Sequence, residues 1–111
     1  MITIEEAIRG WSDRGEIVVV VDELVPRPGA KLRIFRPGSC HLMANGYSEQ
    51  HLDALHKLAA RIGLKAAWFQ PHKRAPHYDL TIGKRARAVA AGAVEVPATA
   101  FIIELRRLSG V

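Results

Sequence analysis

The pattern of apolar and polar residues divides the chain into short strands and longer helices. Ile17–Val21 is a continuous apolar run rich in β-branched residues, typical of a strand buried on both faces, so we expect a strand over 16–22. Lys31–Phe35 alternates basic and apolar residues, which predicts a short strand with one solvated face. Further short strands are expected at Cys40–Ala44, Ala66–Gln70 and Ala93–Val96.

Apolar residues spaced three and four apart predict four helices. Ser, Thr and Pro favour helix starts, and glycine favours helix ends. These signals bound the helices as Thr3 to Gly15, Ser48 to Gly63, Thr81 to Gly92, and Pro97 to Leu108.

Strands alternate with helices in the second half of the chain, which predicts βαβ connections and partly parallel pairing. We therefore expect an α/β fold with three to five short strands in a mixed sheet and about four helices. At 111 residues the chain has the usual size of one domain. Within residues 1–111 we expect an added N-terminal helix over 1–15, a core over 16–96 and a C-terminal helix over 97–111.

The composition is that of an ordinary globular protein, with 49% hydrophobic and 24% charged residues. Cys40 is the only cysteine, which excludes an intramolecular disulfide and fits a reducing cytosol. The N-terminus has no signal-peptide pattern, and no apolar run approaches the ~20 residues that span a bilayer. These features predict a cytoplasmic protein with no membrane partner.

The net charge of +5 is concentrated in two segments. Residues 27–36 carry four cations and no acid, and residues 65–87 carry six cations against Asp79 alone. A localised positive field favours an anionic partner. Alternatively, the basic loops only keep a small domain soluble.

The segment 68–87 combines cations with aromatic residues and is the first candidate site. Lys84 and Arg85 lie in the first turn of a predicted helix, where cations are mildly unfavourable unless an anion binds the exposed N–H groups. This arrangement predicts a phosphate-bearing ligand, either a nucleotide or nucleic acid. The alternative is that Trp68 and Phe69 belong to the core and that Lys84 and Arg87 lie on a solvated helix face. The candidate ligand-binding residues are Trp68, Gln70, His72, Lys73, Arg74, Tyr78, Thr81, Lys84 and Arg85.

His77 and Asp79 are the first candidate catalytic residues. In an extended segment their side chains share a face, so they suit a metal or a base with its orienting carboxylate, although a histidine hydrogen-bonded locally in a turn is the alternative. Cys40 and His41 are adjacent strand residues and point to opposite faces, so they cannot act on each other. His41 can join His77 and Asp79 if their strands are neighbours. Asp22 stands at a strand end, where α/β sheets place ligands, or lies in a simple strand-end turn.

The remaining histidines do not fit a structural zinc site. His51 and His56 are five residues apart on a helix and lie on different sides of its axis. His72 and His77 have no thiolate partner nearby. We therefore predict neither a metal nor another cofactor.

Several motifs together resemble one family. They include Cys40–Ala44, Trp68–Gln70, His77–Thr81 and Lys84–Ala86. They resemble domain of unknown function 4031, a family of small bacterial and phage proteins, over about 18–96, with the N-terminal helix and C-terminal extension added. The resemblance implies one shared site made by His41, Trp68, Gln70, His77, Asp79, Lys84 and Arg85.

Three functions follow from these observations. The first is a binding module for a phosphate-bearing ligand. The second is a small enzyme on a phosphate-containing substrate, with His77 as acid or base, Asp79 as its orienter, His41 as a second proton carrier, and Lys84 and Arg85 as clamps. The third is a phage-type interaction protein whose basic face binds an acidic protein partner and blocks a host factor. The sequence specifies no oligomeric state.

Overall fold

The computed structural model describes residues 1–110 and shows one α/β domain built on a four-stranded mixed sheet. The sheet order is β3-β2-β1-β4, with β1 antiparallel to β2, β2 antiparallel to β3, and β1 parallel to β4. The strand bounds are β1 Val19–Val21, β2 Ser39–Ala44, β3 Tyr78–Thr81 and β4 Val94–Glu95. The expected fold class is confirmed, including the partly parallel pairing.

The four predicted helices are all present, with bounds α1 Ile4–Asp13, α2 Glu49–Arg61, α3 Ile82–Ala90 and α4 Ala98–Ser109. Thr3, Ser48 and Thr81 cap the first three helices, and each side chain accepts a backbone N–H three residues later. Pro97 is the N-cap of α4. Gly63 follows α2 with a φ of +86°, a left-handed conformation that favours glycine.

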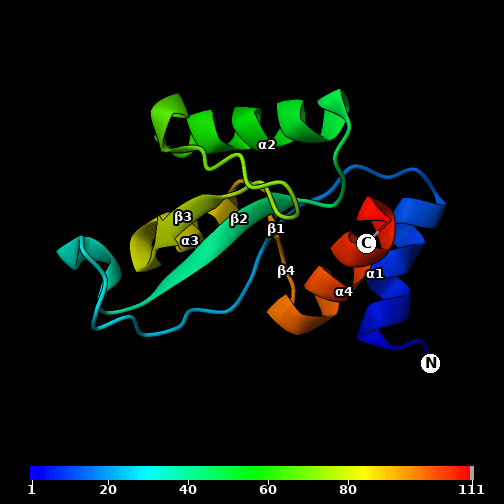
Figure 1. Cartoon of the computed structure of the whole chain (residues 1–111), viewed down its shortest axis with the longest axis horizontal. Coiled ribbons are helices and arrows are strands. Elements are labelled where there is room, and N and C mark those ends of the chain that lie inside the picture. The colour runs from blue at the N-terminus through cyan, green and yellow to red at the C-terminus, as the bar shows by residue number, and fades with distance from the viewer. Residues whose placement is uncertain (111) are drawn as a thin grey trace.

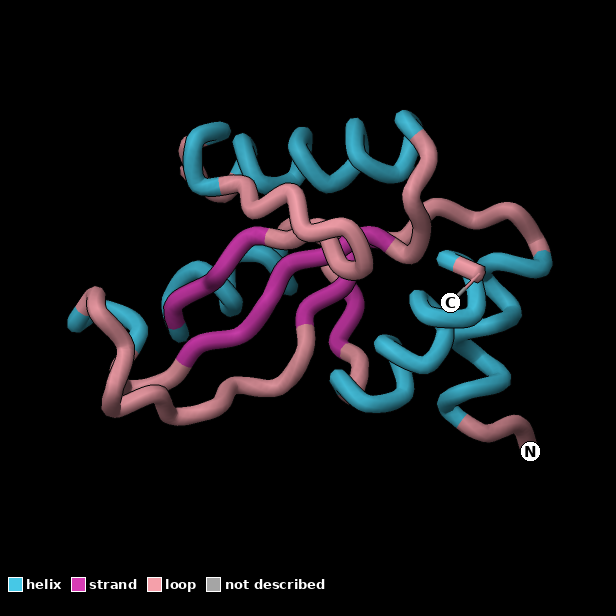
Figure 2. The backbone as a smooth tube through the Cα atoms, in the orientation of Figure 1, coloured by secondary structure: helices cyan, strands magenta, loops and turns pink. Residues whose placement is uncertain are grey.

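The helices cover the two faces of the sheet unequally (Figures 1 and 2). One core packs α2 and α3 against alternate strand residues, including Val21, Leu42 and Leu80. The other core packs α1 and α4 against Val20 and Met43, which point the opposite way from β1 and β2. The second face is therefore covered around β1, while the part formed by β2 and β3 next to His41 stays partly open.

Two predicted strands are wrong. The segment Lys31–Phe35 forms a short 3₁₀ helix, η1 Arg33–Phe35, and the segment Ala66–Gln70 forms mainly a second one, η2 Ala66–Trp68. Each segment lacks a neighbouring strand to pair with along its length. Alternating or apolar character alone cannot hold an extended chain without such a ladder.

The edge strand β3 was not among the predicted strands, although an extended conformation of the segment with His77 and Asp79 was considered. Its burial alternates, with Tyr78 and Leu80 buried and Asp79 and Thr81 half-buried. Strand β1 is also shorter than the expected 16–22. Among the described residues no helix is long and apolar enough to cross a membrane.

Candidate functional site

Strands β2 and β3 place two polar side chains side by side on the partly open part of the sheet. His41 pairs directly with Asp79 in the antiparallel register. Their strand neighbours Cys40, Leu42 and Leu80 point into the core on the opposite face. Because side chains alternate along a strand, His41 and Asp79 share the face that this core does not occupy.

Asp22 follows β1 and fixes the imidazole of His41. Its Oδ2 lies 2.7 Å from His41 Nδ1, and its Oδ1 accepts the His41 backbone N–H at 2.6 Å. Asp22 is buried, with 5% of its surface exposed. This hydrogen bond raises the pKa of His41 above its ordinary value, although burial of the ring opposes the shift. In the neutral ring the proton sits on Nδ1, so Nε2 carries the free lone pair.

His77 precedes β3 and is oriented in the same way by backbone. Its Nδ1 lies 2.8 Å from the carbonyl oxygen of Ala75. A carbonyl oxygen only accepts hydrogen bonds, so Nδ1 of His77 is the donor and Nε2 has the lone pair. The rings of His41 and His77 meet edge to face with centroids 5.0 Å apart.

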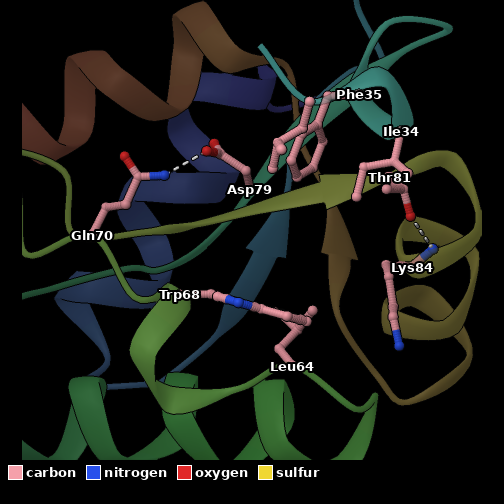
Figure 3. Close-up of a pocket in the computed structure, with 9 residues that line it drawn as sticks. Ile34, Phe35, Leu64, Trp68, Gln70, Asp79, Thr81 and Lys84 are labelled. Atoms are coloured by element: carbon pink, nitrogen blue, oxygen red, sulfur yellow. Dashed lines mark hydrogen bonds between the residues drawn. The ribbon is translucent and has the colours of Figure 1, made fainter. Parts of the chain in front are cut away.

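Three ligand-type atoms converge between these side chains. Asp79 Oδ1 lies 3.8 Å from His41 Nε2 and 3.6 Å from His77 Nε2. One ligand atom from each residue lies within 4.8 Å of the other two. The second carboxylate oxygen of Asp79 accepts a hydrogen bond from the Gln70 amide, as Figure 3 shows. The carboxylate is therefore oriented with Oδ1 toward both imidazoles.

The cluster borders a cavity of about 230 Å³ that reaches the surface. Asp22, His41 and His77 line it together with His72, from the loop before β3, and apolar residues of α4 and β2. The side chains of His41, Asp79 and His77 are 33%, 39% and 16% exposed. A ligand can therefore reach the free atoms of the cluster.

The comparisons with known proteins give one result. A family model described as "Protein of unknown function (DUF4031)" matches residues 19–108. The chain belongs to this family. No curated protein and no solved structure matches it. The match begins at β1, after α1, and includes α4, so it extends beyond the resemblance seen in the sequence.

The structure brings together four of the residues that the DUF4031 resemblance singled out, namely His41, Gln70, His77 and Asp79. It engages the two cations of the pattern elsewhere. Lys84 Nζ donates to the carbonyl oxygen of Ile62 at the end of α2, at 2.7 Å. Arg85 donates to the Asp22 carbonyl oxygen at 2.9 Å and to Glu95 at 2.8 Å. Both cations therefore tie α3 to neighbouring elements.

Three further candidate residues have structural partners. Tyr78 is buried in the core, and its hydroxyl lies 2.8 Å from His56 Nδ1. Thr81 Oγ1 accepts the Lys84 backbone N–H at the start of α3. Trp68 is 50% exposed, with Lys65 Nζ 5.6 Å from its ring centroid. Thr81 and Trp68 also line a cavity that Gln70 and Asp79 line.

The remaining basic candidates lie on the loop beside the cavity. His72, Lys73 and Arg74 are exposed, and His72 lines the cavity. Cys40 is 2% exposed and lies in the core, as expected for a small apolar residue. Burial raises the pKa of its thiol to about 12, with a further increase from the nearby Asp22 carboxylate.

Sequence reasoning missed a second cavity, of about 550 Å³, beside the edge strand β3. Its walls include Leu32, Ile34 and Phe35 of the segment predicted to be a strand, and Leu64 and Trp68 from the other side of β3 (Figure 3). One signal was available. Apolar residues stood inside a basic segment between two prolines, where no predicted helix could bury them.

Proposed function

We propose that this DUF4031 protein is a small metal-dependent enzyme, with a single divalent ion bound by His41 Nε2, His77 Nε2 and Asp79 Oδ1. One observation carries the proposal: one potential ligand atom from each of the three residues lies within 4.8 Å of the other two, and His41 and His77 line the 230 Å³ cavity. His41 lies on β2 and Asp79 on β3, where the sheet register pairs them, and His77 lies directly before β3, held by its bridge to Gln70.

The orientation of the two imidazoles supports a metal more strongly than their proximity does. Each Nδ1 is occupied by a hydrogen-bond acceptor, Asp22 for His41 and the Ala75 carbonyl for His77. Histidines that bind metals through Nε2 commonly have the other nitrogen held by a carboxylate or carbonyl, which fixes the tautomer. The side-chain amide of Gln70 orients the carboxylate of Asp79 in a similar way, by donating a hydrogen bond to its other oxygen.

The separations also suit a first-row transition metal. Zinc binds histidine nitrogen and carboxylate oxygen at about 2.0–2.2 Å, so tetrahedral ligand atoms lie about 3.3 Å apart. Two of the separations, 3.6 and 3.8 Å, lie within about 0.5 Å of that value, and all three residues' ligand atoms lie within 4.8 Å of one another. Small side-chain movements are sufficient for binding.

Three protein ligands leave a coordination position for water or substrate, which is the pattern of catalytic zinc sites. A divalent ion in such a position lowers the pKa of bound water and polarises a substrate oxygen. Hydrolysis is therefore the reaction class that we propose. The chain's own residues bind and orient the ion, and the cavity beside them admits the substrate.

A phosphate-containing substrate is the class that the surrounding charge favours. His72, Lys73 and Arg74 lie on the loop that borders the cavity, and Arg27 is close enough to His41 to oppose protonation of its ring. Cations at a hydrolytic site stabilise the charge of a phosphoryl transition state. Lys84 and Arg85, the clamps expected from the sequence, are paired elsewhere, so the proposal assigns this role to the loop.

The proposal is tested by metal binding and hydrolysis measured on the same protein. We expect the metal-depleted chain to bind one Co²⁺ or Zn²⁺ ion, with Co²⁺ giving visible absorption bands of a low-coordinate site, and to hydrolyse bis(p-nitrophenyl) phosphate when the ion is restored. His41→Ala, His77→Ala and Asp79→Asn each remove a ligand and abolish both properties. Asp53→Asn, on the exposed face of α2, is the matched carboxylate control and changes neither.

Two outcomes contradict the proposal. Wild-type protein that binds neither ion, or variants that bind as tightly as wild type, exclude the metal site. Hydrolysis that persists in chelator and is lost in His77→Ala assigns the cluster instead to metal-free acid–base chemistry. That second candidate is favoured by one specific observation, the Asp22 hydrogen bond that orients His41 as a proton carrier.

A further inference from the structure

The outer side of β3 is a free sheet edge at the centre of the 550 Å³ cavity. Strand β3 is the last strand of the sheet on its side. On the side away from β2, the backbone forms one bridge, between Gln70 and His77 just before β3. The chain leaves this pairing at Pro71, directly after Gln70. Within residues 1–110 no other segment pairs with the outer side of β3.

The backbone of Asp79 points into this open edge. His77 and Gln70 exchange two backbone hydrogen bonds across the outer side, of 2.9 and 3.1 Å. Backbone groups alternate in direction along an antiparallel strand, so Asp79, two residues further on, presents its N–H and C=O to the same side. On β2, Ser39 exchanges both its backbone hydrogen bonds with Val25, away from β3, which agrees with this alternation because Ser39 is paired with Thr81.

Apolar side chains flank both faces of the open edge. Figure 3 shows Ile34 and Phe35 on one side of β3 and Leu64 and Trp68 on the other. Three apolar side chains of this cavity are largely exposed: Leu32 at 60%, Ile34 at 63% and Trp68 at 50%. A strand added to β3 would place alternate side chains against these two walls.

The charge around the groove favours an added strand with acidic residues. The wall segment 31–36 contains Lys31, Arg33 and Arg36 and no acid, and the wall segment 64–70 contains Lys65 and no acid. Among the residues that line the groove itself, Lys84 is the one cation and Asp79 is the one acid, and Gln70 holds the Asp79 carboxylate. An extended peptide with apolar residues at its centre and acidic residues at its flanks is complementary to both the walls and the rim.

We infer that the groove beside β3 is a docking site for an extended acidic peptide segment of a partner protein, which adds to the sheet as a fifth strand. The segment pairs with the backbone of Asp79, places apolar side chains against Ile34 and Trp68, and sets its acidic flanks against the basic segment 31–36. The groove adjoins the proposed metal site and shares Asp79 with it: the backbone of Asp79 faces the open edge, and its carboxylate, held by Gln70, belongs to the proposed metal ligands.

The test uses the synthetic peptide Ac-EEIVIVEE-NH₂ and the metal-depleted full chain in chelator, so that it is independent of the metal site. We expect saturable binding, with chemical-shift changes at the backbone amides of Asp79 and Thr81 in ¹⁵N spectra and slower amide exchange at Asp79. Two control peptides separate the sources of affinity. One has alternate backbone nitrogens methylated, which removes strand pairing, and the other is Ac-KKIVIVKK-NH₂, which reverses the flanking charge.

Matched variants locate the site on the protein. Ile34→Asp and Trp68→Ala alter exposed walls of the groove and are expected to weaken peptide binding at least about tenfold, as expected for central anchors. Ile103→Asp makes the same change as Ile34→Asp at an exposed position of α4 and leaves binding unchanged. The zinc affinity of all three variants is expected to stay at the wild-type value. A loss of peptide binding can therefore be distinguished from a loss of metal binding.

Three results would overturn the inference. Absence of binding by the acidic peptide excludes the proposed partner. Equal binding of the N-methylated peptide shows an apolar ligand pocket that does not use the sheet edge. Equal binding of the lysine-flanked peptide removes the electrostatic selection on which an acidic partner depends.

Discussion

The replacement Asp22→Asn tests how the proposed metal site is built, because it changes one buried atom that is not itself one of the proposed metal ligands. Asp22 accepts two hydrogen bonds from His41, one from the backbone N–H at 2.6 Å and one from Nδ1 at 2.7 Å. Asparagine has one acceptor oxygen and one donor NH₂ in nearly the same volume. The backbone N–H cannot change its role, so it takes the oxygen and the NH₂ faces the ring.

The consequence for His41 is a change of tautomer. Nδ1 must then accept a hydrogen bond, the ring proton moves to Nε2, and the lone pair that faces Asp79 is lost. Removing an orienting partner of this type costs about 10–100-fold in metal affinity, or about 1.4–2.7 kcal/mol. Isothermal titration of the folded, metal-depleted variant with Zn²⁺ measures the loss directly. Asp53→Asn is the control, since that carboxylate pairs with Lys57 on the exposed face of α2.

A zinc affinity of Asp22→Asn within about twofold of wild type, in a protein with an unchanged circular dichroism spectrum, would refute this reasoning. It would show that the tautomer of His41 does not control binding. The backbone hydrogen bond would then be the structural role of Asp22.

Three further predictions concern other parts of the fold. Lys84→Met removes the hydrogen bond to the end of α2 and is expected to lower the free energy of unfolding by about 1–2 kcal/mol in urea titrations. Phosphate binding and zinc affinity are expected to stay unchanged. Weaker phosphate binding by this variant would show that Lys84 contacts the ligand. Cys40, with its buried thiol and a pKa of about 12, is expected to resist iodoacetamide at pH ~8 until the protein unfolds, and rapid labelling of native protein would contradict its placement. The Arg107 hydrogen bond lowers the pKa of Glu104, so its stabilisation is present above the ordinary carboxyl pKa of about 4.3 and is lost as pH falls through the folded value. Glu104→Gln should therefore lose less stability than wild type between about pH 5 and 3 in thermal scans, and an equal loss would count against the ion pair.

The helices were predictable from the sequence because their signals are local. Thr3, Ser48 and Thr81 each cap a helix through their own side chain, and Gly63 supplies the left-handed residue that ends α2. Burial of Cys40 and the opposite orientation of His41 also followed from the alternation along one strand.

The strands were harder to predict, because a strand forms only where another strand lies beside it, and local sequence patterns do not identify that neighbour. Tyr78–Thr81 forms a strand because β2 lies beside it, whereas Lys31–Phe35, with a more strand-like pattern, has no such neighbour. The prediction that His41 can join His77 and Asp79 was conditional on that same pairing, which the structure contains.

The partners of the two first-turn cations could not be predicted from the sequence, for a different reason. Lys84 and Arg85 occupy the first turn of a helix, which favours an anion, but their side chains are long enough to reach a carbonyl of α2 and a carboxylate of β4. Tertiary partners of this kind are invisible to local helix-end rules. The prediction of no metal rested on spacing within one segment, whereas the three residues that we propose as metal ligands come from two strands and a loop.

The most direct measurement of the central claim is a crystal structure of the chain grown with Zn²⁺, with data collected on both sides of the zinc absorption edge. We expect one anomalous peak about 2.0–2.2 Å from His41 Nε2, His77 Nε2 and Asp79 Oδ1, with Asp22 still hydrogen-bonded to His41 Nδ1 and a non-protein ligand completing the coordination. A peak elsewhere, with these three atoms left uncoordinated at saturating zinc, would contradict it.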